Sequence, residues 1–374
     1  MTNLKIKFVD LAAEFKENKI IYNKLFNKVG ESGQYVLGHS LKNFEKFFAN
    51  FCDTKFAIGV NSGSDALVLS LRALKIGYND EVILPVNSFI ATAWAVAAVG
   101  AKPIYCDIQE DLNIDPNKIE SLLTKKTKAI ITVHLTGKPA EMSKILELAK
   151  KHDLFVIEDA AQAVGSTYKK KKVGSFGHTA AFSLHPLKNL NVLGDGGVIT
   201  TDSKKIYNHI LKDRNHGLID RNTSTIWGLN SRLDELQAEI AYFRLKHLKK
   251  INNYHNKIAN IYIKNLSHIL DVPFMKSYEV SSFHNFIIKV KKRNSLMKYL
   301  NSNGIETKIH YPKLLHLQPC SKNLKYKRGD FPIAENLNRK ILSLPIYYGL
   351  CFEKVKKVCN LILKFYEKEQ RFKF

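Results

Sequence analysis

The chain has 374 residues, of which 45% are hydrophobic and 25% are charged, and its formal net charge is +24. This length exceeds what one hydrophobic core usually serves, so we expect a globular protein with a large domain and a smaller one. Lysines are spread along the whole chain, and no nucleic-acid-binding motif accompanies them. The charge therefore indicates either a solvated basic surface or attraction for an acidic substrate, and we expect no nucleic-acid partner.

The cysteines and the amino-terminal segment bear on the cell compartment. No two of the five cysteines form a CxxC pair, so the sequence predicts neither a metal site nor a disulfide framework. The first 15 residues lack the apolar core of a signal peptide, and the most apolar stretch, 88–101, is too short to cross a bilayer. We expect a cytoplasmic protein with reduced thiols and no membrane partner.

Short apolar runs alternate with helical patterns through the first two-thirds of the chain. We expect helices at 61–74, 88–100 and 141–152. The expected strands are 57–60, 81–85, 102–108, 128–135, 154–159 and 179–184. This alternation predicts a mostly parallel sheet covered by helices on both faces. In such sheets a ligand binds beyond the carboxyl ends of the strands, so the polar residues that follow each strand are the site candidates.

The pattern changes at Arg232, where apolar residues begin to recur every three or four positions over a long stretch. We expect a long helix that leaves the large domain. A smaller α/β segment follows, with a strand at 283–290 and a late helix at 355–368. We therefore predict a large domain over 1–248 and a small carboxyl-terminal domain over 249–374.

Two of the strand ends carry polar residues with two interpretations each. Gly63, Ser64 and Asp65 open a helix and either bind an anion with free N–H groups or form an ordinary cap, with Ser64 or Asp65 at the N-cap. Asp159 ends the strand 154–159 and either caps a helix or faces a buried cation, whereas its neighbour Glu158 would be the exposed acid.

Lys188 follows the apparently buried strand 179–184 and precedes a glycine-rich run, Gly194 to Gly197. Most lysines are solvated surface residues. A lysine held at the end of a buried strand, beside glycines that let backbone approach closely, can instead form a Schiff base with a carbonyl.

These residues together match the needs of one cofactor. Pyridoxal phosphate requires a lysine for its aldehyde, an acid for its ring nitrogen and donors for its phosphate. Lys188, Asp159 and the helix start at Gly63 supply one each, while Ser183 offers a further donor and Phe89 an aromatic face.

Blocks of sequence in a fixed order carry a family resemblance that runs nearly end to end. They are 35–51, VNSGSDAL at 60–67, 80–96, VIEDAAQAVGSTY at 156–168, FSLHPLKNLNVLGDGGVITT at 182–201, 228–238, 304–312 and 341–347. In these blocks the chain resembles the DegT-type nucleotide-sugar aminotransferases, a branch of the fold-type I enzymes that use pyridoxal phosphate. Leu184 and Asp195 depart mildly from the family pattern. The resemblance implies an α/β fold with a mostly parallel sheet in the large domain.

The resemblance also implies roles around the cofactor ring. Lys188 matches the lysine that binds the cofactor and moves the proton between cofactor and substrate. Asp159 matches the acid paired with the pyridine nitrogen, and Gln162 matches the residue beside the ring's phenolic oxygen. Phe89 matches the aromatic side chain that covers one face of the ring.

Further matches concern the phosphate and the neighbouring subunit. Ser183, with the backbone N–H groups of Ser64 and Asp65, matches the phosphate cradle. Asn230 matches an asparagine that a second subunit gives to the same phosphate, so the resemblance implies a homodimer with shared sites. His185, close to Lys188, is expected to be a packed or structural histidine rather than a catalytic base.

The family reaction transfers an amino group from L-glutamate to a nucleotide-linked keto-sugar, with His310 and Tyr311 at the mouth of the site. The blocks 228–238 and 310–319 favour carbon 3 of a dTDP-3-keto-6-deoxyhexose, which gives a dTDP-3-amino-3,6-dideoxyhexose for surface polysaccharides. Lys308 and Lys313 are candidates for holding the diphosphate.

Three alternatives stay open. The first is amination of a UDP-linked sugar or of carbon 4. The second is a dehydratase of the same fold, in which the related branch has histidine where Lys188 stands. The third is a non-enzymatic regulator or scaffold, which would not require the lysine, the acid and the cradle together.

Overall fold

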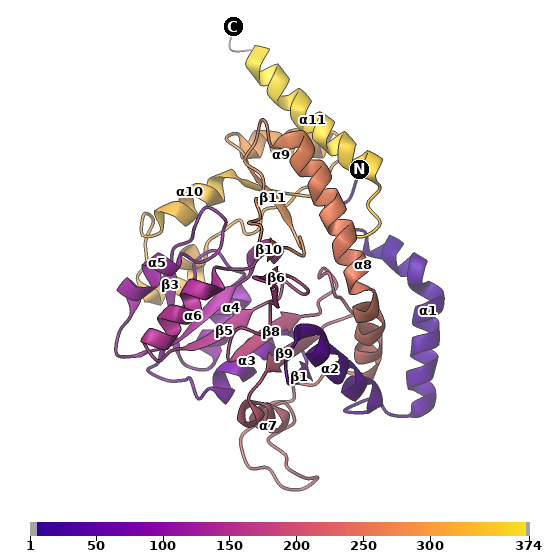
Figure 1. Ribbon diagram of the computed structural model, residues 1–374, viewed down its shortest axis with the longest axis vertical. Coiled ribbons are helices and arrows are strands. Elements are labelled where there is room, and N and C mark those ends of the chain that lie inside the picture. The colour runs from indigo at the N-terminus through magenta and orange to yellow at the C-terminus, as the bar shows by residue number, and fades with distance from the viewer. Residues whose placement is uncertain (1–5, 372–374) are drawn as a thin grey trace.

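The computed structural model describes residues 6–371 and is built around one large twisted sheet (Figure 1). The strand order is β1-β9-β8-β5-β4-β2-β3, and β9 alone among these strands runs antiparallel to its neighbours. The strands span β1 Phe56–Val60, β2 Glu81–Pro85, β3 Lys102–Cys106, β4 Thr127–Val133, β5 Phe155–Asp159, β8 Thr179–Ser183 and β9 Gly197–Thr201. The mostly parallel sheet predicted from the sequence is confirmed.

Helices cover both faces of this sheet because successive strand residues point to opposite sides. Ile58 and Val60 join the cluster under α3, α4 and α7, whereas Ala57 joins the cluster under α2 and α8. The helices of the large domain span α1 Leu11–Ser32, α2 His39–Cys52, α3 Gly63–Ala73, α4 Ile90–Ala98, α5 Pro116–Ile119, α6 Met142–Lys151 and α7 Lys204–Asp213.

The long helix α8, Glu235–Leu266, connects the large domain to the carboxyl-terminal part (Figure 1). Ile240 lies in the large-domain cluster, while Ile258 and Tyr262 lie in a separate cluster built by the later elements. These elements are β11 Phe286–Lys289, α9 Arg293–Ser302, β12 Ile341–Leu344 and α11 Phe352–Arg371. The helix α10 Pro332–Lys340 instead packs Ala334 and Leu337 into the cluster under α3 and α4. The predicted boundary at 248/249 falls inside α8 and stays a prediction.

A small three-stranded sheet lies beside the large one, with β10 Glu279–Val280, β6 Thr167–Tyr168 and β7 Lys171–Lys172. The expected helix from Arg232 begins at Glu235, after a short extended segment. Within residues 6–371 we find no helix long and apolar enough to cross a bilayer.

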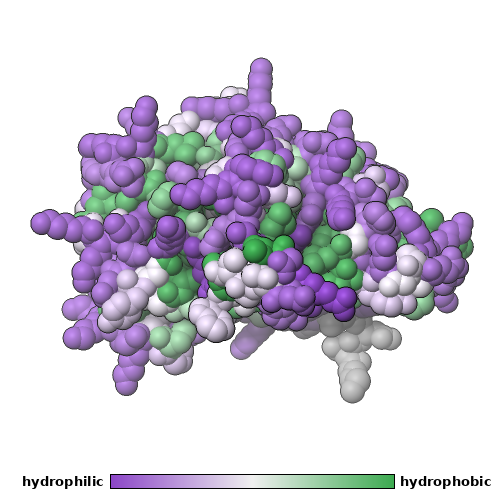
Figure 2. Space-filling view, turned by 90° about the horizontal axis from the view of Figure 1, so that it is seen from below, coloured by the Kyte–Doolittle hydropathy of each residue, from purple (hydrophilic) through white to green (hydrophobic). Residues whose placement is uncertain are grey.

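The surface at the α7 end of the molecule is mostly hydrophilic, with hydrophobic patches between the charged side chains (Figure 2). The loop that follows α7 protrudes here (Figure 1). Its Trp227 is 97% exposed and its Ile219 is 53% exposed. Large apolar side chains on a protruding loop are typical of a contact with another protein surface.

Candidate active site

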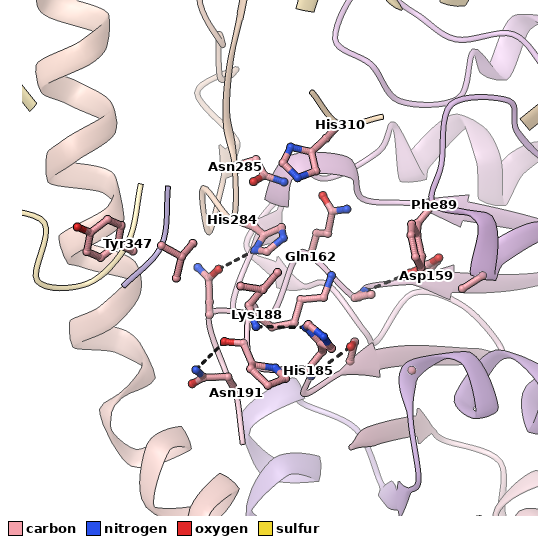
Figure 3. Close-up of a pocket in the computed structure, with 18 of the residues that line it drawn as sticks. Phe89, Asp159, Gln162, His185, Lys188, Asn191, His284, Asn285, His310 and Tyr347 are labelled. Carbon is pink, nitrogen blue, oxygen red and sulfur yellow. Dashed lines mark hydrogen bonds between the residues drawn. The ribbon is translucent and has the colours of Figure 1, made fainter. Parts of the chain in front are cut away.

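A cavity of about 420 Å³ opens at the carboxyl ends of the large sheet, where residues of the small domain cover it (Figure 3). This is the place where open α/β sheets bind their ligands. The structure brings nine of the predicted site residues into its lining: Gly63, Ser64, Phe89, Asp159, Gln162, Ser183, Lys188, His310 and Tyr311.

Lys188 lies in a turn after β8, where its backbone N–H donates to the carbonyl of His185 at 2.8 Å. Burial lowers the pKa of its amine to about 8, although the charge of Asp159 acts in the opposite direction. At pH 7 about one amine in ten is then neutral, compared with about one in three thousand for an ordinary lysine. The site therefore holds an amine that is available as a nucleophile.

Asp159 ends β5 and is 7% exposed. Its Oδ2 accepts from the Thr92 hydroxyl at 2.8 Å, and its Oδ1 accepts from the Ala161 N–H at 3.2 Å. Burial raises the pKa of this carboxyl, against these hydrogen bonds and the charge of Lys188. No helix begins after β5, so the helix-cap interpretation of Asp159 is wrong.

Glu158 points to the other side of the sheet and is completely buried, so the expectation that it is the exposed acid is wrong. One of its oxygens accepts from the ring of His134 at 3.0 Å and the other from the N–H of Phe176 at 2.7 Å. The alternation of side chains along a strand separates the two neighbouring acids, so Asp159 alone reaches the cavity.

The polar and aromatic side chains above the cavity form a connected set. Gln162 accepts from the N–H of Thr136 at 2.7 Å and donates to the Tyr311 hydroxyl at 3.0 Å. The ring of Phe89 lies 5.4 Å from that of Tyr311. His310 shares a hydrogen bond of 2.9 Å with Ser343, and burial lowers its pKa to about 4, so it is neutral near pH 7.

The amino terminus of α3 points at the cavity beside Ser183. Ser62 is its N-cap and accepts from the Asp65 N–H at 3.1 Å, so the expectation of Ser64 or Asp65 at the N-cap is wrong. The same bond engages the Asp65 N–H that was expected in the phosphate cradle. The N–H groups of Gly63 and Ser64 remain directed outward, as is typical of an anion site.

Other candidate residues lie outside the cavity lining. Asn230 is exposed at the base of the loop that follows α7, where it pairs with Asn215. Lys308 and Lys313 are exposed, and Lys308 pairs with Glu306 at 2.8 Å. His185 lines the cavity and is exposed, so it is not a packed histidine, although its Nδ1 accepts from the Leu187 N–H at 3.3 Å within the turn.

The sequence analysis missed several residues of the site. Thr92 is one, although it lies in the first turn of α4, and its N–H donates to the carbonyl of the N-cap residue Phe89 at 3.1 Å. His284 and Asn285 are two more, contributed by the segment that leads into β11 (Figure 3). The sequence signal that could have indicated them was a pair of polar residues near the start of the expected apolar strand 283–290.

The residues present fit pyridoxal phosphate. The Lys188 amine, whose pKa is lowered, and the buried acid Asp159 line one cavity, and the ring of Phe89 lines it too. The cradle is tightly built, because a Cβ on Gly63 would lie 2.7 Å from the Cβ of Ser183. Within residues 6–371 no cluster of side chains suits a metal ion.

Comparison with known proteins places the chain. The model of the DegT/DnrJ/EryC1/StrS aminotransferase family matches residues 17–363. The chain belongs to this family. The matched range includes the large sheet, the helix α8 and most of the carboxyl-terminal elements. The resemblance seen in the sequence blocks is confirmed.

Individual DegT relatives are similar over almost their full length. The dTDP-3-amino-3,6-dideoxy-alpha-D-galactopyranose transaminase of Aneurinibacillus thermoaerophilus is 39% identical over 96% of this chain and 99% of its own. The dTDP-3-amino-3,4,6-trideoxy-alpha-D-glucose transaminase of Streptomyces venezuelae is 39% identical over 91% of each chain. The structure of NtdA from Bacillus subtilis with bound cofactor PMP superposes with a TM-score of 0.91, at 32% identity, over 96% of this chain and 85% of that one.

Proposed function

We propose that this aminotransferase uses pyridoxal phosphate to move an amino group from L-glutamate to carbon 3 of a dTDP-3-keto-6-deoxyhexose. The product would be a dTDP-3-amino-3,6-dideoxyhexose. Lys188 carries the proposal, because its amine is held in the cavity with a pKa near 8 and with Asp159 as its charged partner. The relatives named for dTDP-3-amino sugars support the choice of sugar.

Each residue has a physical task in this proposal. Lys188 binds the cofactor aldehyde through its amine and carries the proton at its Nζ between successive steps. Asp159, fixed by Thr92, accepts a hydrogen bond from the ring nitrogen and holds positive charge there. When bound, the cofactor supplies an electron sink for the carbon that loses its proton.

The remaining residues bind and orient. Ser183 and the N–H groups of Gly63 and Ser64 hold the phosphate at the positive end of α3. Phe89 would cover one face of the cofactor ring, and Gln162 would bind near its phenolic oxygen. Tyr311, hydrogen-bonded to Gln162, and the neutral His310 line the entrance on the substrate side.

We also propose a cytoplasmic homodimer in which the loop after α7 reaches the site of a second copy. The exposed Asn230 and the exposed Trp227 on that loop support this arrangement. Asn230 would donate its amide to the phosphate bound by the other subunit.

The test is isotope transfer. L-glutamate labelled with ¹⁵N on its amino group is incubated with the enzyme and a dTDP-3-keto-6-deoxyhexose, and the nucleotide sugar is analysed by mass spectrometry. We expect one ¹⁵N per product molecule and none with Lys188→Ala. A product that has lost a hydroxyl and carries no ¹⁵N would contradict amino transfer and indicate a dehydratase.

A further inference from the structure

The part of the cavity that the small domain covers contains a polar pair with no assigned task, His284 and Asn285. Figure 3 shows both side chains facing the cavity beside His310, on the side where Lys188 enters. Lys188 lies close enough that its charge lowers the pKa of His284. Whatever contacts this pair is therefore next to the reacting centre.

Asn285 is a buried amide without a partner. Its residue is 3% exposed, and its Nδ2 is buried with no hydrogen-bond partner in the part of the chain that the structure describes. A buried amide left unpaired costs about 1–3 kcal/mol. Its Nδ2 donor is thus left for a group that comes from outside the chain.

The protonation of His284 follows from its neighbour Asn189. The Nδ2 of Asn189 donates to the backbone carbonyl of Ser282 at 2.9 Å, which fixes the amide so that its Oδ1 is the acceptor. That Oδ1 lies 3.2 Å from the Nδ1 of His284, so His284 carries its proton on Nδ1. Asn252 confirms the amide orientation, because its own Oδ1 accepts from the same Nδ2.

The other nitrogen of His284 therefore presents a lone pair to the cavity. Burial, reinforced by Lys188, keeps the pKa of this ring well below its usual value, so Nε2 stays unprotonated near pH 7. A lone pair on His284 stands next to an unpaired amide on Asn285. The ligand group that satisfies both must donate one hydrogen bond and accept another.

We propose that His284 and Asn285 form a subsite for a sugar hydroxyl adjacent to the carbon that receives the amino group. A hydroxyl donates to Nε2 of His284 and accepts from the Asn285 amide with one oxygen atom. A carboxylate offers acceptors only and would face the lone pair, so the subsite distinguishes the sugar from L-glutamate. This inference rests on the nucleotide-sugar function proposed above.

The experiment follows the two half-reactions separately by the absorbance of the bound cofactor. The probes are L-glutamate, a dTDP-3-amino-3,6-dideoxyhexose, and the analogues of that sugar that lack the hydroxyl at carbon 2 or at carbon 4. Each is reacted with the wild type, with Asn285→Leu and with His284→Phe, both of which keep the side-chain bulk.

We expect each variant to lose about 10- to 100-fold in kcat/KM for the complete sugar, which corresponds to one or two buried hydrogen bonds. The wild type should show a similar loss for one of the two deoxy analogues, and on that analogue the variants should differ little from the wild type. The rate with L-glutamate should stay within about twofold, because a carboxylate does not use the pair.

Two results would overturn the subsite. One is an equal loss for all three sugars, which is the signature of a merely structural role. The other is a matching loss with L-glutamate. If the wild type exchanges an amino group with L-glutamate but with none of the dTDP sugars, the proposed sugar substrate itself fails and the subsite falls with it. A failure of the proposed substrate is visible in the wild type without any variant, so it is distinguishable from the two results that overturn the subsite.

Discussion

The Lys188 amine, which we propose binds the cofactor aldehyde, lies in an environment that disfavours its charged form. Burial disfavours the ammonium form and moves the pKa of the amine to about 8, and Asp159 offsets this only in part. The same burial raises the pKa of Asp159. Such opposed shifts of two facing groups are typical of catalytic sites.

The pH dependence of cofactor binding tests this environment. A lysine attacks an aldehyde as the neutral amine, so the rate for cofactor-free protein should rise about tenfold per pH unit below 8 and level off above it. The rate is measured from the absorbance that develops after pyridoxal phosphate is added, between pH 6 and pH 10. A rate that keeps rising to pH 10 would indicate an ordinary solvated lysine.

The residues of the site differ in how far the sequence predicts them. Asp159 ends an apolar strand and Lys188 lies in the turn after another, and the topology of parallel sheets brings such positions together. Asn285 cannot be recognised in this way, because its unpaired amide results from the packing of the small domain over the cavity. Asn230 was predicted by resemblance alone, and one subunit cannot test its role.

At the scale of elements, the junction of α3 with β8 is the phosphate cradle that we propose. The outward N–H groups of α3 reach Ser183 only because Gly63 carries no side chain. An added Cβ would lie 2.7 Å from the Cβ of Ser183 and 3.1 Å from its Cα. The Cα belongs to a central strand of the sheet, so it cannot move away easily.

Gly63→Ala should therefore weaken cofactor binding by about 5- to 150-fold, since overpacking of this kind costs about 1–3 kcal/mol. Titration of the cofactor-free variant with pyridoxal phosphate gives the dissociation constant. The matched control is Gly30→Ala in α1, where nothing lies within 4 Å of the added Cβ. Gly30→Ala should bind the cofactor as the wild type does. If both variants bind the cofactor equally well, the junction of α3 with β8 does not bind its phosphate.

The elements themselves follow well from the sequence where the pattern is strong. All six expected strands of the large sheet and the helices α3, α4, α6, α8 and α11 are present. The sequence analysis did not predict β9, the antiparallel strand, because its pairing with β1 and β8 depends on tertiary contacts that no local pattern records. The start of α8 was placed three residues early, since helix ends are set by local capping.

At the scale of the whole molecule, the proposal requires two copies of the chain. The loop after α7 protrudes from the molecule (Figure 1). Asn230 lines no part of the cavity in its own chain. A symmetric dimer gives each site one loop from the partner.

Mixed dimers test the shared site. Lys188→Ala and Asn230→Ala proteins should each have little activity alone. In a mixed dimer one site combines an intact Lys188 with an intact Asn230 from the other subunit, so random exchange should restore about a quarter of the wild-type activity. The activity is assayed after the subunits are dissociated and reassembled together. No recovery from verified mixed dimers would show that Asn230 does not act across the interface.

The central claim is that Lys188 holds pyridoxal phosphate in a site that accepts an amino group from L-glutamate. The most direct measurement is the absorbance spectrum of the purified enzyme before and after L-glutamate is added, with Lys188→Ala measured in parallel. We predict a visible band from the lysine-bound cofactor that L-glutamate replaces by the near-ultraviolet band of the amine form, and no such lysine-bound band in the variant. A wild-type protein that binds no pyridoxal phosphate, or whose band L-glutamate leaves unchanged, would contradict this account.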